Sequence, residues 1–198
     1  MNTRLADFLA ARAAETYPEP RMAGHTDLTA RMAERVAKLL PAGARVIDVG
    51  CGQGPALEWF KAHGFDALGI SSNVKETAQL NARGFHVLLR DMHEIGLPAT
   101  CYDCVWARHV LEHSVIPFFV LHEFARALKP GGILYVEVPG PDTDSHHETN
   151  ANHYSVMGDR MWASLIARAG FAIVDAQEIR LKTPLGRDVY FSFTARKL

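Results

Sequence analysis

The sequence predicts an α/β protein in which helices cover both faces of a mostly parallel sheet of seven strands. Three observations support this class. Short apolar segments rich in Val and Ile alternate with amphipathic helical segments from residue 45 onward. A glycine-rich turn at residues 50–54 follows the first of these strands. The last two strands are separated by a loop too short for a helix, so this final pair must be antiparallel.

Two helices precede the first strand. Apolar residues at helical spacing predict an amphipathic helix over residues 3–16, which ends before two prolines. A second helix is expected to begin with Thr26 or Asp27 as its N-cap and to end at Leu40.

Strands and helices then alternate along the core. Strands are expected at residues 45–49, 66–70, 85–89, 103–107, 132–138, 171–178 and 189–195. Helices are expected at residues 55–63, 74–83, 117–128 and 158–169, with Ser155 as the N-cap of the last. No linker is found, so we expect one domain over 1–198, with a helical cap at 1–40 and a core at 44–198.

Composition excludes several protein classes. The 198 residues carry a net charge of −1, which provides no general attraction for nucleic acid or anionic lipid. Three cysteines cannot form a disulfide framework, and the Cys101–Cys104 pair has no second pair to complete a zinc site. The longest apolar run, residues 115–121, is too short for a bilayer. We therefore expect a cytoplasmic protein; its one unusual feature is ten histidines.

The turn after the first strand is a candidate ligand site. It contains Gly50, Gly52 and Gly54 beside Asp48, and glycines let a ligand approach backbone N–H groups at a helix N-terminus. A dinucleotide fingerprint would need its third glycine at Pro55, and the turn lacks the lysine of a phosphate-binding loop.

Four motifs in order carry a resemblance to a known family. They are Ile-Asp-Val-Gly-Cys-Gly-Gln-Gly at 47–54, Arg-Asp-Met at 90–92, Tyr-Asp-Cys-Val-Trp-Ala-Arg-His-Val-Leu-Glu-His at 102–113, and Arg-Ala-Leu-Lys-Pro-Gly-Gly at 126–132. With them the sequence resembles the class I, seven-stranded S-adenosylmethionine-dependent methyltransferases of the small-molecule subgroup. The resemblance implies a three-layer Rossmann-like sandwich.

The resemblance also implies a cofactor site for S-adenosylmethionine, with S-adenosylhomocysteine as the product. The residues expected to hold the cofactor are Asp48, Gly50, Gly52, Ser71, Asp91, Met92 and Arg108. One of them departs from the family, because Ser71 stands where an acid usually binds the ribose hydroxyls. Ser72 or Asn73 could supply weaker hydrogen bonds, each worth about 1 kcal/mol, or Asn73 could simply cap the next helix.

Histidines are the candidate catalytic residues. By resemblance the reacting methyl group lies near the end of the fourth strand, which makes His109 the first candidate for a general base. His146 and His147 are the second, in a polar stretch at 139–154 that also contains Glu148 and His153. This stretch could hold a metal, contact substrate, supply a base or be only a solvated loop. Our interpretation assigns no metal site.

The expected reaction is transfer of a methyl group to an oxygen or nitrogen of a small molecule. We expect no nucleic-acid or membrane partner and a monomer or homodimer. Two alternatives stay open: a non-catalytic cofactor-binding subunit, and a metal-assisted O-methyltransferase. Tyr17, Met22 and His25, between the first two helices, could also reach a ligand.

Overall fold

The computed structural model describes residues 3–15 and 23–198 of the chain. Its strands are β1 (Arg45–Val49), β2 (Asp66–Ser71), β3 (His86–Leu89), β4 (Tyr102–Arg108), β5 (Leu128–Pro139), β6 (Phe171–Thr183) and β7 (Gly186–Lys197). Its α-helices are α1 (Thr3–Glu15), α2 (Ala23–Ala37), α3 (Pro55–Ala62), α4 (Val74–Ala82), α5 (Pro117–Ala127) and α6 (Asp159–Arg168). Short 3₁₀-helices are η1 (Met92–Glu94), η2 (Leu111–His113) and η3 (His147–Thr149).

The seven strands form one sheet in the order β3-β2-β1-β4-β5-β7-β6. Strands β1 to β5 are parallel, and β7 is antiparallel to both β5 and β6. The predicted α/β class and the antiparallel final pair are therefore confirmed. Strand order reverses between β1 and β4, so the chain leaves a crevice at the carboxyl ends of these two strands, where ligands of such sheets bind.

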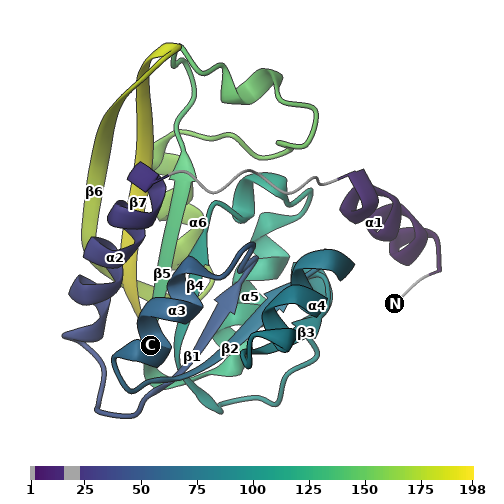
Figure 1. Cartoon of the computed structure of the whole chain (residues 1–198). Helices are drawn as coiled ribbons and strands as arrows, with labels where there is room; N and C mark the ends of the chain where they lie inside the picture. Colours follow the sequence, from purple (N-terminus) through teal and green to yellow (C-terminus); the bar gives the residue numbers. More distant parts are fainter. Residues whose placement is uncertain (1–2, 16–22) are drawn as a thin grey trace.

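Helices pack on both faces of the sheet (Figure 1). Apolar side chains of α2 and α3, including Met32 and Phe60, pack with Trp106 and Tyr135 on one face. The other face carries α5 and α6, whose buried residues include Phe124 and Trp162. This double covering explains why β1, β4 and β5 are apolar on both sides.

Several predicted boundaries were wrong. Helix α2 ends at Ala37 and not at Leu40, β6 extends to Thr183, and β7 begins at Gly186. Helix α2 begins at Ala23, so Thr26 lies inside the helix and does not cap it. Strand β5 begins at Leu128, because Leu128 pairs with Tyr102 ahead of a bulge in the ladder. Ser155 does not cap α6, whose N-cap position is Gly158; its hydroxyl instead donates to the Ser114 carbonyl oxygen at 2.7 Å.

The cysteine thiols belong to the fold. Cys104 is buried within β4, and burial raises the pKa of its thiol, which disfavours the reactive thiolate.

Across residues 3–15 and 23–198, no helix is long and apolar enough to cross a membrane.

Candidate active site

The glycine turn between β1 and α3 combines tight packing with open space. Gly50, Gly52 and Gly54 all have positive φ angles. A Cβ on Gly50 would lie 2.5 Å from a Val110 methyl group, and one on Gly54 would lie 2.7 Å from a Leu80 methyl group. A Cβ on Gly52 would meet nothing within 4 Å. The turn therefore packs firmly on the protein at two glycines and leaves room for a ligand at the third.

Asp48 and Arg108 place a carboxyl group and a guanidinium group beside this turn. Asp48 is buried, and its Oδ2 has no hydrogen-bond partner within the described part of the chain. Burial raises the pKa of Asp48 to about 8, although the positive charge of Arg108 opposes the shift. The Arg108 Nε lies 2.8 Å from Glu137 Oε1, while its Nη2 is buried without a hydrogen-bond partner among the described residues. These two buried atoms without hydrogen-bond partners, one on a carboxyl group and one on a guanidinium group, fit the ammonium and carboxylate groups of the amino-acid end of S-adenosylmethionine.

Ser71 is the last residue of β2, and its hydroxyl group is hydrogen-bonded to two neighbouring residues. Its hydroxyl donates to Glu76 Oε2 at 3.2 Å and accepts from the Asn73 backbone N–H at 3.1 Å. Asn73 caps α4, since its Oδ1 accepts from the Glu76 backbone N–H at 3.1 Å. The capping alternative for Asn73 is thus confirmed, and Ser72 is exposed.

Asp91 follows β3 and caps η1. Its Oδ1 accepts from the His93 backbone N–H at 2.8 Å and lies 2.5 Å from His93 Nδ1. His93 Nε2 in turn lies 2.7 Å from the Ser114 hydroxyl oxygen, and Met92 packs on the apolar core. One Asp91 oxygen is therefore occupied in positioning, and the other is available for a ligand.

His109 follows β4 in a left-handed backbone conformation, with φ of +56°. Its Nε2 lies 3.0 Å from Glu137 Oε1, and its ring stacks on Tyr190 with centroids 4.5 Å apart. Glu137 is fully buried, and burial alone would raise its pKa. The His109 hydrogen bond and the Arg108 charge outweigh burial and lower the pKa of Glu137 to about 2. Glu137 is therefore an ionised carboxylate that fixes both neighbours.

A second histidine–carboxylate pair joins the loop after β5 to β7. His147 Nε2 lies 2.9 Å from Asp188 Oδ1, and the Ser145 hydroxyl donates to Asp188 Oδ2 at 2.9 Å. Burial alone would raise the pKa of Asp188, but these two contacts lower it. The His147 ring also meets Tyr190 edge to face. Tyr190 thus lies against both histidine–carboxylate pairs.

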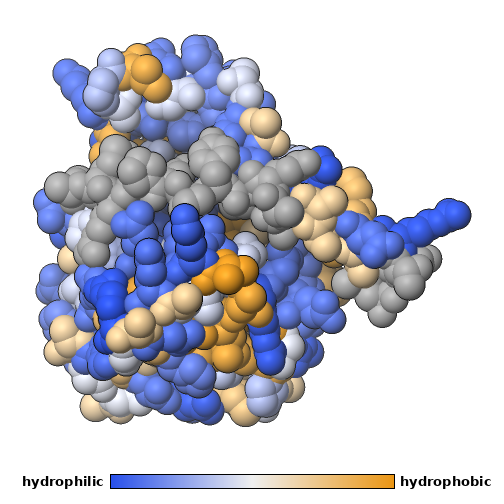
Figure 2. Space-filling view, turned by 45° about the vertical axis from the view of Figure 1, so that its right-hand side comes forward, coloured by the Kyte–Doolittle hydropathy of each residue, from blue (hydrophilic) through white to orange (hydrophobic). Residues whose placement is uncertain are grey.

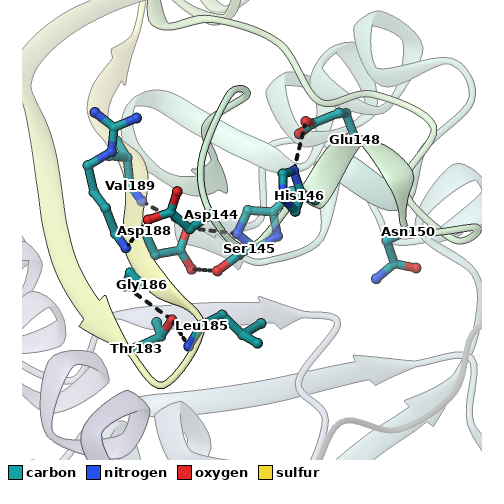
Figure 3. A network of polar contacts seen from close by, with 12 residues as sticks. Asp144, Ser145, His146, Glu148, Asn150, Thr183, Leu185, Gly186, Asp188 and Val189 are labelled. Atoms are coloured by element: carbon teal, nitrogen blue, oxygen red, sulfur yellow. Dashed lines mark hydrogen bonds and ion pairs between the residues drawn. The ribbon is translucent and has the colours of Figure 1, made fainter.

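The structure separates the two neighbouring loop histidines. The His147 side chain is 14 % exposed and the His146 side chain 69 %. His146 turns toward Glu148, while Asp188 and Ser145 face each other across the gap to β7 (Figure 3). Only His147 of this pair lies inside the site.

His153 was grouped in the sequence with the other polar residues of the loop, but in the structure it lies near Glu112 and His113. One ligand atom from each of Glu112, His113 and His153 lies within 4.8 Å of the others. His113 Nδ1 lies 2.9 Å from the Asn152 carbonyl oxygen and donates to it. The His153 ring stacks on the ring of His147, with centroids 5.6 Å apart.

The loop over residues 140–158 is tied down rather than loosely solvated. The Gly140 backbone N–H donates to the Val189 carbonyl oxygen at 2.8 Å, at the start of the loop. The Tyr154 backbone N–H donates to the Glu112 carbonyl oxygen at 2.7 Å, near its end. The part of the molecule that carries this loop and the tip of β6 and β7 is covered mainly by hydrophilic residues (Figure 2).

Sequence reasoning missed four residues of the site: Glu76, Glu137, Asp188 and Tyr190. Glu137 had a signal, since it interrupts an apolar strand, and a buried acid needs a partner. The other three had none. Tyr17 and Met22 lie outside the described residues, and only the backbone of His25 is described.

Comparison with known proteins identifies the family. The sequence pattern of the methyltransferase domain matches residues 22–176, which is most of the chain. The chain belongs to this family. The family predicted from the four motifs is therefore confirmed, and with it S-adenosylmethionine as the cofactor.

Relatives of the methyltransferase act on small molecules by name. The 27-O-demethylrifamycin SV methyltransferase of Amycolatopsis mediterranei is 28 % identical over 82 % of this chain and 67 % of its own length. The chain is 30 % identical to malonyl-[acyl-carrier protein] O-methyltransferase of Enterobacter lignolyticus, over 65 % of this chain and 53 % of that protein. It is also 30 % identical to sterol 24-C-methyltransferase of Yarrowia lipolytica, over 58 % of this chain and 32 % of that protein. The chain therefore spans about two thirds or less of the length of these three relatives.

Solved structures share the fold. Burkholderia thailandensis 1,6-didemethyltoxoflavin-N1-methyltransferase, with bound 1,6-didemethyltoxoflavin and S-adenosylhomocysteine, has a TM-score of 0.76 at 21 % identity, covering 100 % of this chain and 90 % of its own. A cyclase, SpnF, has a TM-score of 0.69 at 23 % identity, covering 85 % and 80 %. One fold thus serves different reactions, and function must be argued from the site.

Proposed function

We propose that this methyltransferase transfers a methyl group from S-adenosylmethionine to an oxygen or nitrogen of a small molecule. The observation that carries the proposal is the pair of histidine–carboxylate contacts on either side of Tyr190. The first pair lies at the carboxyl ends of β4 and β5, and the second joins the loop after β5 to the start of β7. The names of two relatives, 27-O-demethylrifamycin SV methyltransferase and malonyl-[acyl-carrier protein] O-methyltransferase, support transfer to oxygen.

The cofactor would be held by opposite charges at one end and the glycine turn along its length. The Oδ2 of Asp48 would accept a hydrogen bond from the α-ammonium group, and Nη2 of Arg108 would donate one to the α-carboxylate. Gly52 would admit the cofactor to the backbone, while Gly50 lets the turn pack against Val110. The second Asp91 oxygen would accept a hydrogen bond from the adenine amine. Met92 would pack on the ring.

His147 is the proposed general base. An ionised Asp188 can only accept a hydrogen bond, so His147 carries its proton on Nε2 and a lone pair on Nδ1. The acceptor O–H or N–H gives its proton to Nδ1 as its lone pair attacks the methyl carbon. When bound, S-adenosylmethionine would supply the methyl group from its positively charged sulfur, which would take the electron pair of the carbon–sulfur bond. Base assistance of this kind contributes about 10²–10⁴-fold.

His109 is the proposed positioning group on the other side of Tyr190. Its Nε2 is hydrogen-bonded to Glu137 and its ring stacks on Tyr190. These two contacts fix the ring in place. It would line the acceptor pocket and set the orientation of the acceptor relative to the methyl group.

The decisive experiment follows a labelled methyl group. Purified protein is incubated with methyl-labelled S-adenosylmethionine and a small-molecule extract, and product formation is followed by label and by S-adenosylhomocysteine release. Label should appear in a low-molecular-weight product. Tight cofactor binding with no label transfer to any acceptor fraction would contradict the proposal and favour a role like that of a cofactor-binding subunit.

A second candidate is a metal-assisted O-methyltransferase, and Glu112, His113 and His153 favour it. Two imidazoles and one carboxylate suit several divalent metals, and His113 donates its second ring N–H to a backbone carbonyl, as metal-bound histidines do. Chelator treatment separates the candidates. Methyl transfer that persists unchanged without bound metal would remove this one.

A further inference from the structure

The end of β2 contains a carboxylate, although the strand itself supplies none. In dinucleotide-binding sheets an acid about 20 residues after the glycine turn binds the ribose hydroxyls. Here Ser71 occupies that place, and it is buried. Its hydroxyl donates to Glu76 Oε2 at 3.2 Å, so the carboxyl group of Glu76 lies against the end of the strand.

Helix α4 directs Glu76 toward the cofactor turn. Glu76 and Leu80 are four residues apart and share one face of the helix. Leu80 reaches the turn itself, since a Cβ on Gly54 would lie 2.7 Å from its methyl group. The Cys51 backbone N–H, in the same turn, donates to the Ile70 carbonyl oxygen at 3.0 Å. Glu76 therefore lies between the turn and the end of β2.

The helix alone does not explain a buried glutamate here. An acid in the first turn of a helix is stabilised by the helix dipole, but it obtains that benefit in solvent. Glu76 is 9 % exposed, and burial of a carboxylate is unfavourable unless its oxygens are hydrogen-bonded. In the part of the chain that the structure describes, Ser71 is the one side chain that bonds to its carboxyl group. The other oxygen is left for a ligand.

We propose that Glu76 binds the ribose hydroxyls of the cofactor, with Ser71 as the residue that positions it. The acid that β2 lacks is thus supplied from α4. A carboxylate accepts hydrogen bonds from a vicinal diol, and such charge-assisted bonds are stronger than those a serine or amide could make. Ser72 is exposed and Asn73 uses its Oδ1 to cap α4, so neither competes for this role.

The test compares two ligands that differ only in the diol. Isothermal titration measures S-adenosylhomocysteine and its 2′,3′-dideoxy counterpart against wild-type protein, Glu76→Gln and Glu76→Ala. Wild type should prefer the ribose ligand by about 10- to 100-fold. In Glu76→Ala the preference should fall to near one, because only the ribose ligand loses affinity. Glu76→Gln should lie between them.

Two further variants distinguish binding from structure. Glu34→Gln, an exposed glutamate on α2, should leave the preference unchanged. Ser71→Asp combined with Glu76→Ala returns an acid to the strand and should restore the preference. This rescue separates lost binding from a damaged fold.

Since the inference rests on the proposed cofactor, the outcomes are kept apart. A wild-type preference that survives in both Glu76→Ala and Glu76→Gln overturns the role of Glu76 and leaves the proposed function standing. No binding of S-adenosylhomocysteine by wild type overturns both. A ribose preference that disappears in Glu76→Ala, found together with no methyl transfer, overturns the proposed reaction alone.

Discussion

The two halves of the active site are assembled differently. We define the cofactor half as Asp48, the turn at 50–54, Ser71, Glu76 and the segment 91–92. Its side-chain hydrogen bonds join residues two to five positions apart, as in Asn73 with Glu76 and Asp91 with His93. The acceptor half consists of the two histidine–carboxylate pairs and Tyr190. Its pairs join residues 28 and 41 positions apart. Local turns thus form the donor site, while sheet pairing and one long loop form the acceptor site.

The largest expected effect isolates the acceptor half. His147→Ala should lower methyl transfer by about 10²–10⁴-fold, because the acceptor proton loses its base. Cofactor affinity, measured by titration, should stay within about twofold, since among the described residues no hydrogen bond or ring contact joins His147 to the glycine turn. His146→Ala is the matched control, and its exposed ring predicts near wild-type turnover. A larger loss in the His146 variant than in the His147 variant would contradict the assignment.

Glu137→Gln should affect both halves through the fold. The substitution leaves Arg108 without its anionic partner inside the protein, which typically costs about 3–5 kcal/mol. Thermal or urea unfolding measures this loss. Glu178→Gln, which removes an exposed partner of Arg180, should change stability little.

The same residue predicts the acid limb of stability. The folded pKa of Glu137 is about 2 and the ordinary value is 4.5, so its stabilisation is complete above pH 4.5. It is lost as the pH falls from 4.5 toward 2. Wild type should therefore lose stability faster than Glu137→Gln over that interval. Parallel curves for the two proteins would count against an ionised Glu137.

Gly52→Ala should weaken the cofactor half alone. The added methyl group enters space that no protein atom fills, so it should lower cofactor affinity by about tenfold or more. Gly64→Ala is a matched control, because its φ is also positive and its Cβ would also meet nothing within 4 Å. Both variants should lose about 1–2 kcal/mol of stability from backbone strain. Equal cofactor affinity in the two variants would place the ligand elsewhere.

At Asp48, one substitution should change stability and cofactor binding in opposite directions. The folded pKa of about 8 lies above the ordinary 3.8, so unfolding releases a proton and the stability of the cofactor-free protein falls as the pH rises from about 4 to 8. Asp48→Asn removes this dependence. Its Tm should exceed that of wild type by several °C near pH 8, at about 2–4 °C per kcal/mol. Cofactor binding should weaken in the same variant. A lower Tm at every pH would contradict a buried, unpaired carboxyl group.

The same contrast explains how far the sequence could be interpreted. The seven strands, the antiparallel final pair and the cofactor turn were predictable, because periodicity and short motifs encode them. Asp188 and Tyr190 were not, because their role depends on the β5–β7 register, which brings Tyr190 opposite Pro139. Glu76 was hidden by its place in a helix, where glutamate is common. His146 and His147 look alike in the sequence, and only the loop path separates them.

The anchoring of loop 140–158 suggests how proteins of this architecture diversify. Its ends are held through the backbone N–H groups of Gly140 and Tyr154, and a backbone N–H donates without a particular side chain. Mutations between those anchors can accumulate over generations without releasing the loop or disturbing donor binding. A lineage can therefore acquire new acceptors while keeping the same methyl donor, because separate contacts hold the acceptor loop and the donor site.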